Sequence, residues 1–412
     1  MKNNSKIIKK LMMENDRAFY IYDEKIIDRQ IKILSEKMSH FEFIYSVKTN
    51  PYKPIVNFIA SKGLGADAAS AQEVMIAKEA GLSYDKVLYS SPGKTRTDIE
   101  KTIDKSIIIA DSYNELALIN DVARQRNLHI NIGLRVNPDY IMDVGKGSSS
   151  KFGVDEETLV TQKDFISNLS NVKIVGIHVH LSSQILDYSL LYGYYEKIFD
   201  LAIFCKETMD WELEFINFGG GIGVAYSTLN DKPLNIEKLS NQSENLIKNF
   251  KDKLNLRLII ETGRFVICEA GQYVTQIVDK KESRGTKYLI VENGLNGFLR
   301  PSIAQLLTAY TPEGSKLKGS EPLFTSKDAF DFTIIDADES NLEKVSIVGN
   351  LCTATDIMVK DIMLPKAEIG DIVVVSKAGS YSYSLSPLLF ASQHLPLQFY
   401  MDINGNILRE NF

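Results

Sequence analysis

The chain has 412 residues, of which 44% are hydrophobic, a composition typical of a folded globular protein rather than a disordered one. Its formal net charge of −6, without a block rich in lysine and arginine, argues against a nucleic-acid-binding surface. No apolar run reaches the roughly 18 residues of a membrane span, and the charged N-terminus lacks the apolar stretch of a signal peptide. The three cysteines, at 205, 268 and 352, are far apart, so we expect a reducing cytoplasm rather than a disulfide framework.

Eight strand-like runs occupy the first 265 residues, at 41–47, 65–66, 87–89, 106–110, 131–134, 172–179, 215–218 and 256–260. Helix-patterned stretches separate them, at 24–38, 52–62, 71–80, 97–104, 112–126, 187–208 and 235–253. This alternation implies parallel strands joined by right-handed crossovers, and eight such units predict a (β/α)8 TIM barrel over residues 24–270. The carboxyl ends of the strands then share one rim, which carries the active site.

Lys48 follows the first of these runs directly. A lysine at a strand end is most often solvated surface, and that alternative stays open. On the rim of a barrel, however, its amine can be buried. Desolvation lowers the pKa of a lysine and supplies the free amine that a Schiff base needs.

A long connection, residues 137–171, follows the fifth run and contains a flexible segment at 145–150. A long loop on the active rim indicates a lid or a phosphate contact. The sixth run then ends in His178-Val179-His180, which places both imidazoles on one face of a strand. That spacing alone could suggest a metal, but no cysteine or carboxylate pair accompanies it, so we expect no metal site.

Three successive glycines, Gly219, Gly220 and Gly221, follow the seventh run. Such a run is often only a turn. Here it stands where barrels of this kind customarily bind phosphate, and glycines let backbone N–H groups approach an anion closely.

Glu261-Thr262-Gly263-Arg264 follows the eighth run. The conservative interpretation is a buried Glu–Arg pair that closes the barrel. The functional one assigns Glu261 to a protonated ring nitrogen and Arg264 to a substrate carboxylate. A phosphate site, a Schiff-base lysine and a carboxylate for a pyridinium together describe pyridoxal 5'-phosphate.

The pattern changes after residue 270, and a chain of 412 residues exceeds the usual size of a single core. Short β-rich runs occur at 272–277, 287–291, 332–335, 343–348, 371–375 and 397–400. They predict a mostly β C-terminal domain over residues 271–412, joined by the N-terminal strand within 1–23.

With these motifs in place, the chain resembles the fold-type III pyridoxal-phosphate decarboxylases of ornithine, arginine and diaminopimelate. The resemblance covers almost the whole chain. It rests on the lysine motif at 45–50, the acidic motif at 67–73, the histidine motif at 178–184, the glycines 219–221, the segment 261–264, the arginine segment 296–301, the cysteine motif at 349–356 and the tyrosine motif at 378–381.

The resemblance implies a role for each matching residue. The catalytic residues are Lys48, His180, Glu261 and Cys352. The cofactor-binding residues are Lys48, Asp67, Arg135, His180, Ser183, Gly219, Gly220, Gly221, Glu261, Gly263, Arg264 and Tyr381. The substrate-binding residues are Arg264, Arg300, Thr353, Asp356 and Tyr381. The resemblance also implies a homodimer whose cysteine loop completes the partner's active site; on its own, Cys352 would be a small buried hydrophobe.

Thr353 is the most informative departure from the family pattern. The similar ornithine and diaminopimelate enzymes carry an acid at this position, directly after the cysteine, where it meets the distal amine of the substrate. A threonine hydroxyl cannot supply that charge, so its presence should alter substrate choice. The loop 91–94 and the segment 384–387 are more similar to a secondary-metabolism branch that acts on carrier-protein-bound glutamate or amide-linked siderophore intermediates.

We therefore expect a pyridoxal-phosphate-dependent α-decarboxylase of an amino acid or an amino-acid conjugate, free or carrier-linked. Carbon dioxide would leave from the external aldimine, and Cys352 or a water that it positions would reprotonate Cα. Three alternatives remain: the diaminopimelate decarboxylase of lysine biosynthesis, a fold-type III racemase, and a non-catalytic cofactor carrier. The similar racemases place an arginine against the ring nitrogen, so Glu261 favours decarboxylation, and the carriers lack a second domain.

Overall fold

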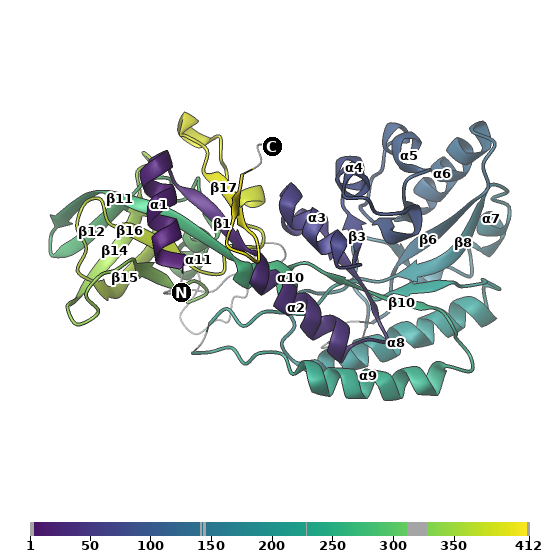
Figure 1. Ribbon diagram of the computed structural model, residues 1–412. Helices are drawn as coiled ribbons and strands as arrows, with labels where there is room; N and C mark the ends of the chain where they lie inside the picture. Colours follow the sequence, from purple (N-terminus) through teal and green to yellow (C-terminus); the bar gives the residue numbers. More distant parts are fainter. Residues whose placement is uncertain (1–3, 141, 143–145, 228, 311–327, 410–412) are drawn as a thin grey trace. The chain divides into compact units, whose positions relative to one another are not determined.

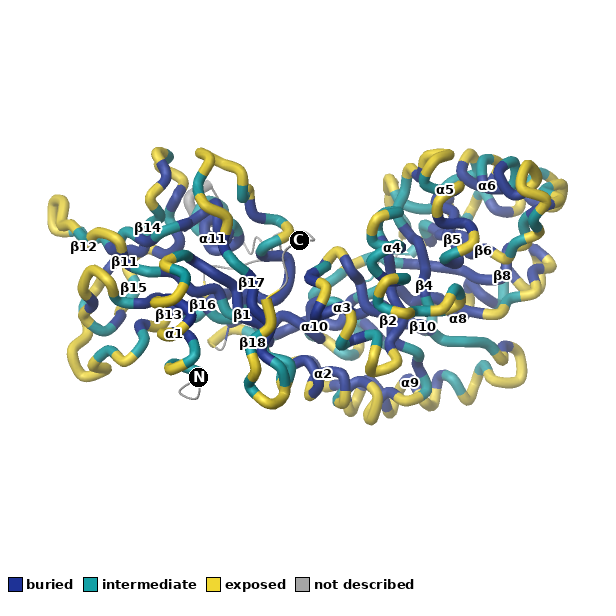
Figure 2. Tube along the Cα trace, turned by 45° about the horizontal axis from the view of Figure 1, so that its top comes forward, coloured by how far each residue is buried: buried dark blue, intermediate teal, exposed yellow. Residues whose placement is uncertain are grey.

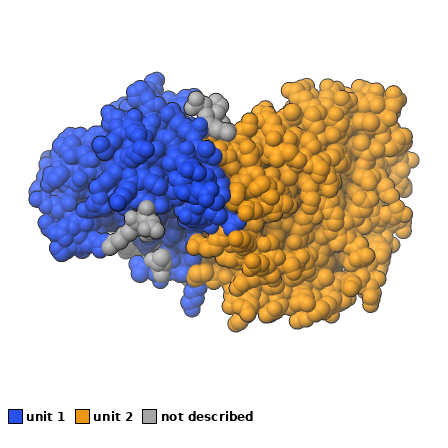
Figure 3. Space-filling view, viewed as in Figure 1, with its two compact units in different colours: residues 1–28, 225–232, 266–412 blue, residues 29–224, 233–265 orange. Residues whose placement is uncertain are grey.

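A computed structural model describes residues 4–140, 142, 146–227, 229–310 and 328–409. The chain divides into two compact units (Figure 3). Unit 1 comprises residues 1–28, 225–232 and 266–412, and unit 2 comprises residues 29–224 and 233–265. Gly145, in the segment predicted to be flexible, lies outside the described residues.

Unit 2 contains a closed barrel of parallel strands, which confirms the predicted TIM barrel (Figure 1). The strands follow one another around the barrel as β5-β4-β3-β2-β10-β9-β8-β6, and pairing of β5 with β6 closes the ring. Their bounds are β2 (Glu42–Ser46), β3 (Gly65–Ala68), β4 (Val87–Tyr89), β5 (Ile107–Ala110), β6 (Ile130–Asn137), β8 (Val172–His178), β9 (Phe215–Asn217) and β10 (Arg257–Thr262). A two-residue strand, β7 (Val154–Asp155), pairs with the end of β6.

Helices connect these strands, and the 3.6-residue periodicity predicts seven of them; the short helices at 163–167 and 264–267 were not predicted. The helices are α2 (Glu24–Lys37), α3 (Lys53–Ser61), α4 (Ala71–Glu79), α5 (Arg96–Thr102), α6 (Tyr113–Gln125), α7 (Lys163–Ser167), α8 (Tyr188–Glu207), α9 (Ile236–Phe250) and α10 (Arg264–Ile267). Several begin at a side chain that accepts a hydrogen bond from a backbone N–H of the first turn, namely Ser70, Thr95, Ser112, Asp187 and Asn235. These caps fix where each helix begins, and therefore how long each rim loop is.

Apolar side chains of six barrel strands form one buried cluster, which includes Ile44, Leu88, Ile107, Ile109, Val175, Phe215 and Ile259. The Phe215 ring of β9 needs space that only glycine leaves at one position on β8 and one on β6. A Cβ on Gly176 would lie 2.2 Å from the Phe215 ring, and one on Gly133 would lie 3.0 Å from it. The barrel is therefore packed solid, and polar chemistry belongs at the strand ends.

Unit 1 is built around a curled sheet, as predicted for the C-terminal part of the chain. Its strands are β1 (Phe19–Asp23), β11 (Gly271–Ser283), β12 (Thr286–Val291), β13 (Phe332–Ile334), β14 (Leu342–Gly349), β15 (Ile357–Pro365), β16 (Ile372–Val375), β17 (Leu397–Met401) and β18 (Ile407–Leu408). The N-terminal strand β1 pairs antiparallel with β11 and parallel with β17. Figure 2 shows the strands of both units as largely buried and the tips of the loops as exposed.

Two helices of unit 1 were not predicted, α1 (Ser5–Asn15) and α11 (Leu299–Tyr310), and neither was the strand β15. In α1, Ile8, Leu11 and Met12 are buried against the sheet residues Phe19, Val274 and Phe399. Their i, i+3, i+4 spacing is a short amphipathic signal that tertiary packing converts into a helix. No helix of the described residues combines the length and the apolar character needed to cross a bilayer.

Candidate active site

Lys48 and Asp67 lie at the carboxyl ends of two adjacent strands, β2 and β3. Lys48 is part of a 3-10 turn, Val47–Thr49, and its Nζ lies 3.9 Å from Asp67 Oδ2. The Asp67 side chain is fully buried, whereas 42% of the Lys48 side chain is exposed. Ser90, at the end of β4, donates a hydrogen bond to Asp67 Oδ1. The rim therefore holds an amine that a small molecule can reach, with a carboxylate fixed behind it.

Glu261 is buried in β10 beside one polar side chain of β9 and one of β8. Asn217 Nδ2 donates to Glu261 Oε1 at 2.9 Å, and His178 Nε2 lies 3.1 Å from the same oxygen. Burial alone would raise the pKa of this carboxyl, but the two histidines and Lys48 outweigh it and hold the pKa below its ordinary value. Glu261 is therefore an ionised hydrogen-bond acceptor in a water-poor setting, which suits a protonated nitrogen of a ligand.

His180 follows β8, and its ring is oriented by a backbone hydrogen bond. The Gly220 N–H donates to His180 Nδ1 at 2.9 Å, so the ring proton of the neutral imidazole resides on Nε2. Burial lowers the pKa of His180 to about 4. The ring is thus neutral near pH 7, and Ser183 Oγ lies 3.5 Å from its Nε2.

The glycine loop (residues 219–224) follows β9, and its conformation requires glycine. Gly219 has φ 67°, and a Cβ there would lie 2.4 Å from the Val179 carbonyl and 2.8 Å from His180. A Cβ on Gly263, after β10, would lie 2.0 Å from Thr49 Oγ1. Glycine at both positions therefore lets neighbouring rim segments approach each other closely.

Two of the loop's backbone amides already have acceptors within the barrel. The Gly219 N–H donates to Asn217 Oδ1 at 2.9 Å, and the Gly220 N–H donates to His180, as described above. Among the described residues, the Gly221 N–H has no acceptor. The N–H groups of Gly223 and Val224 also have acceptors, so an anion in this loop would meet the Gly221 N–H in the middle of the loop.

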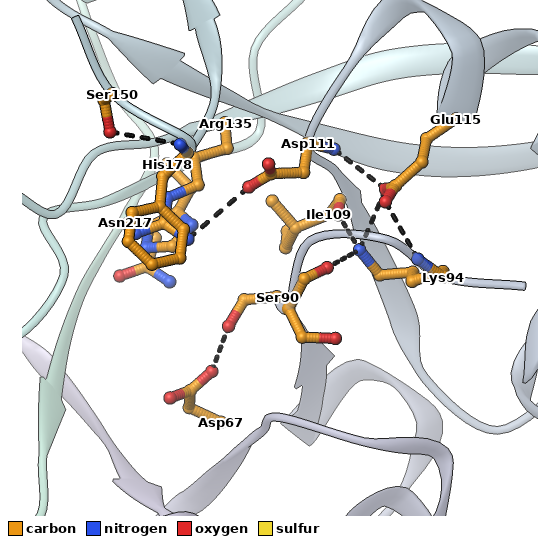
Figure 4. Close-up of polar contacts among 12 residues, drawn as sticks. Asp67, Ser90, Lys94, Ile109, Asp111, Glu115, Arg135, Ser150, His178 and Asn217 are labelled. Atoms are coloured by element: carbon orange, nitrogen blue, oxygen red, sulfur yellow. Dashed lines mark hydrogen bonds and ion pairs between the residues drawn. The ribbon is translucent and has the colours of Figure 1, made fainter.

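Arg135 belongs to a chain of polar contacts on the rim (Figure 4). Its Nη1 lies 3.4 Å from Asp111 Oδ1, and its guanidinium lies 4.3 Å from the centre of the Phe152 ring. Glu115 accepts hydrogen bonds from the backbone N–H groups of Asp111 and Lys94 and from Lys94 Nζ. The contact with Phe152 places part of the long loop after β6 over the Arg135 guanidinium.

The remaining predicted residues lie in unit 1, apart from Arg264 at the beginning of α10. Cys352 is exposed and Thr353 half-buried in the turn between β14 and β15. The Asp356 carboxylate, in contrast, is buried and accepts hydrogen bonds from the backbone N–H groups of Leu295 and Leu351. These contacts give Asp356 a role in fixing the cysteine loop.

Arg300 and Tyr381 are both buried in unit 1. The Arg300 guanidinium lies 4.9 Å from the Tyr226 ring centre and 5.1 Å from that of Phe330, and it donates to the Ser380 carbonyl. Tyr381 has φ 50°, a left-handed conformation that an aromatic residue seldom adopts. Such conformations cluster at functional sites.

Sequence reasoning gave no site role to four residues that the structure places at this rim: Glu73, Lys94, Gln184 and Asn217. Burial raises the pKa of Glu73 to about 7, and its Oε2 accepts the Ala69 N–H at 2.7 Å. A signal existed for Asn217, because a polar residue on a buried strand two positions before a glycine run needs a partner. For Lys94 and Gln184, the only signal in the sequence was that each residue lies within a motif.

The described residues fit pyridoxal phosphate on grounds of their own chemistry. Lys48 offers an accessible amine, Glu261 an ionised acceptor for a ring nitrogen, and Gly221 a backbone donor for phosphate. His180 offers a neutral ring that can lie against a flat one. No group of three or more metal-ligating side chains occurs within the described parts of the chain.

Comparisons with known proteins agree with this fit. Residues 24–268 match the family described as "Pyridoxal-dependent decarboxylase, pyridoxal binding domain". An L-glutamyl-(BtrI acyl-carrier protein) decarboxylase of Niallia circulans is 30% identical over 395 residues, covering 93% of this chain and 88% of the relative. The diaminopimelate decarboxylase of Aquifex aeolicus is 27% identical over 386 residues, covering 92% and 85%. A crystal structure of the diaminopimelate decarboxylase of M. jannaschii in complex with L-lysine has a TM-score of 0.84 at 26% identity, covering 97% of this chain and 91% of that one.

Proposed function

Because the chain belongs to the family of pyridoxal-dependent decarboxylases, we propose that its substrate is an amino acid whose distal end is bound through a thioester or an amide. The first candidate is glutamate carried on an acyl-carrier protein. The chain is an enzyme, a carboxy-lyase that uses pyridoxal phosphate to remove an α-carboxylate as carbon dioxide. What we propose is the substrate, the roles of individual residues and the assembly.

Thr353 is the observation that supports a masked distal end, that is, a substrate whose distal group is bound in a thioester or an amide. It occupies the position at which the similar ornithine and diaminopimelate enzymes carry an acid. Its Oγ1 lies 2.9 Å from Thr355 Oγ1, and residues 353–355 carry two hydroxyl groups and no carboxylate. A distal ammonium would lose a charge-assisted partner here, whereas a thioester or amide needs none.

The barrel residues would hold the cofactor at three places. Lys48 would carry it covalently, Glu261 would accept the N–H of its ring nitrogen, and His180 would lie against its ring. Asp67, Arg135, Ser183, Gly219, Gly220, Gly221, Gly263, Arg264 and Tyr381 would complete its surroundings. When bound, pyridoxal phosphate supplies the electron sink for the charge that carbon dioxide leaves behind.

Glu261 favours decarboxylation through its charge. His178 and Asn217 both contact its Oε1, so Glu261 stays ionised and can keep a proton on the nitrogen that it faces. A positive ring nitrogen attracts the electrons of the breaking bond more strongly than a neutral one. The Lys48 amine is accessible, so it would hold the cofactor where a substrate amine can reach it.

Cys352 would hold the proton that the substrate α-carbon receives after carbon dioxide leaves. Its exposure in a single chain supports a homodimer in which this loop completes the active site of the partner subunit. We also propose that Arg264, Arg300, Thr353, Asp356 and Tyr381 contribute to substrate binding. The Asp356 contribution is the positioning of the loop that carries Cys352 and Thr353.

We propose that residues 24–270 form the cofactor domain and that residues 271–412, with 1–23, form the β-rich domain. The cytoplasm is the proposed compartment, because Cys205, Cys268 and Cys352 are all free thiols. An amino-acid pathway that makes a secondary metabolite is the proposed setting.

Carbon dioxide release tests the proposed substrate. The purified enzyme should decarboxylate a glutamyl carrier protein, and its kcat/KM on ornithine, lysine and meso-diaminopimelate should be lower by about ten- to a hundredfold. Thr353→Glu should recover part of the activity on meso-diaminopimelate, whereas Thr355→Glu, the same charge two residues away, should not. The buried Ala304 limits the expected gain, because diaminopimelate enzymes commonly have a tyrosine there.

A diaminopimelate decarboxylase is the second candidate, because relatives and solved structures with that activity cover most of the chain. A wild-type kcat/KM on meso-diaminopimelate above about 10⁴ M⁻¹s⁻¹ would establish it and overturn the masked-end proposal. Another group, supplied by the partner subunit, would then meet the distal amine.

A further inference from the structure

We propose that Gln184 is a positioning residue that fixes the glycine loop (residues 219–224) in its anion-binding conformation. Gln184 belongs to the segment after β8, and it has no chemical role in the proposed reaction. The inference rests on the proposed phosphate role of the glycine loop and adds the residue that sets the loop's shape.

Gln184 holds the end of the loop through both polar atoms of its side chain. Its Nε2 donates to the Val224 carbonyl, and its Oε1 accepts the Val224 N–H at 3.1 Å. One primary amide thus reproduces both hydrogen bonds of a strand pair. A carboxylate could accept from the N–H but would face the carbonyl with a second acceptor.

The backbone next to Gln184 holds the middle of the loop in the same way. Ile185 and Ile222 form a parallel β-bridge, in which the Ile185 N–H donates to the Gly221 carbonyl at 2.8 Å and the Gly223 N–H donates to the Ile185 carbonyl at 3.0 Å. A Cβ on Gly223 would lie 2.8 Å from that carbonyl, so glycine is needed for this approach.

Gln184 itself has φ 62°, in the left-handed region that disfavours residues with a side chain. A strained backbone persists only where surrounding contacts impose it. Here two sets of contacts impose it: the Gln184 side chain binds Val224, and the next residue, Ile185, forms a bridge with Ile222. The strain at Gln184 therefore serves to direct this amide toward the loop.

The position of these contacts explains what they would achieve. The first two loop amides, Gly219 and Gly220, donate to Asn217 and His180. The Gly221 N–H comes next; the Ile185 bridge holds the Gly221 carbonyl and the Gly223 N–H, and Gln184 holds Val224 at the end of the loop. A donor that is already fixed loses no conformational entropy when the ligand binds. The affinity for phosphate is therefore higher.

The test compares cofactors with and without phosphate, on the apoenzyme. Equilibrium binding of pyridoxal phosphate and of pyridoxal is measured for wild type, Gln184→Ala and Gln184→Glu. Gln125→Ala, on the exposed end of α6, is the matched control. We expect both Gln184 variants to bind pyridoxal phosphate about tenfold more weakly or worse, to bind pyridoxal within twofold of wild type, and to retain pyridoxal on Lys48 after borohydride reduction.

Each outcome decides between specific alternatives. Unchanged affinity for pyridoxal phosphate, or an equal loss for both ligands, would overturn the role of Gln184 and leave the proposed function standing. If wild type bound pyridoxal as tightly as pyridoxal phosphate, the phosphate role of the loop itself would fail. If Gln184→Ala did not fold, the nearly isosteric Gln184→Glu would decide, since it keeps the shape of the side chain and one of its two hydrogen bonds.

Discussion

Lys94 and Glu115 form an ion pair beneath the barrel rim, with 3.1 Å between Nζ and Oε2 and no exposed surface on the lysine side chain. Lys94 Nζ also donates to the carbonyls of Ser91 and Ile109, so all three of its donors are used. Burial lowers the pKa of Lys94, and Glu115 partly opposes that effect. This pair ties the loop after β4 to the beginning of α6.

Lys94→Met should destabilise the protein by about 3–5 kcal/mol, because it leaves the Glu115 carboxylate buried without its cation. Urea denaturation of wild type and variant measures the difference. Lys105→Met, which removes the partly exposed contact with Asp104, is the control and should cost less than about 1 kcal/mol. Equal losses in the two variants would mean that the buried pair contributes no more than a surface one.

Lys48→Ala should abolish the visible absorbance of the bound cofactor and all turnover. Lys48 Nζ is the accessible amine next to Asp67, and no other amine is proposed to carry the cofactor. Borohydride reduction of the wild type followed by peptide mapping should find the cofactor on the peptide that contains Lys48. A label on any other lysine would contradict the assignment.

Cys352→Ala should bind cofactor normally but lose about 10²–10⁴-fold in kcat, the usual contribution of a general acid or base. The exposed position of Cys352 makes a folding defect unexpected, and thermal denaturation checks this. Cys352→Ser should be impaired as well, because a hydroxyl is a far weaker acid than a thiol. A kcat equal to that of wild type would remove Cys352 from the reaction.

His180 should make the apoprotein less stable as the pH falls. Burial lowers the pKa of its ring to about 4 from the ordinary 6.5, so between these values the unfolded chain binds a proton that the folded one does not. Stability is therefore lost as the pH falls from 6.5 toward 4, by up to roughly 3 kcal/mol.

His180→Asn isolates this contribution. Asparagine keeps an acceptor for the Gly220 N–H but does not titrate. The free energy of unfolding of wild type minus that of the variant should decrease as the pH falls from 6.5 to 4.5, while contributions of other groups such as Glu73 cancel. A difference that stays constant over this range would show that His180 is not buried in its neutral form.

The barrel could be predicted because each strand carries its own signal, a short apolar run that ends at a polar or glycine residue. Lys48, Asp67 and Glu261 are far apart in sequence, yet the topology alone brought them to one rim. Gln184 could not be assigned, because its partner is a backbone group 40 residues away. The packing of α1 against the sheet of unit 1 could not be predicted for a similar reason, since the burial of α1 depends on strands formed by the other end of the chain.

The pairing of β1 with β11 and β17 also determines when unit 1 can form. Ribosomes make the chain from its N-terminus, so β1 is complete about 250 residues before β11 and about 375 before β17. All eight barrel strands lie between β1 and β11, and they can fold while β1 is still an unpaired strand with both edges open. A nascent chain stopped before residue 397 would keep one of those edges exposed, and open edges favour aggregation. Translation through β17, which ends at Met401, is thus a condition for pairing the second edge of the strand that begins at residue 19.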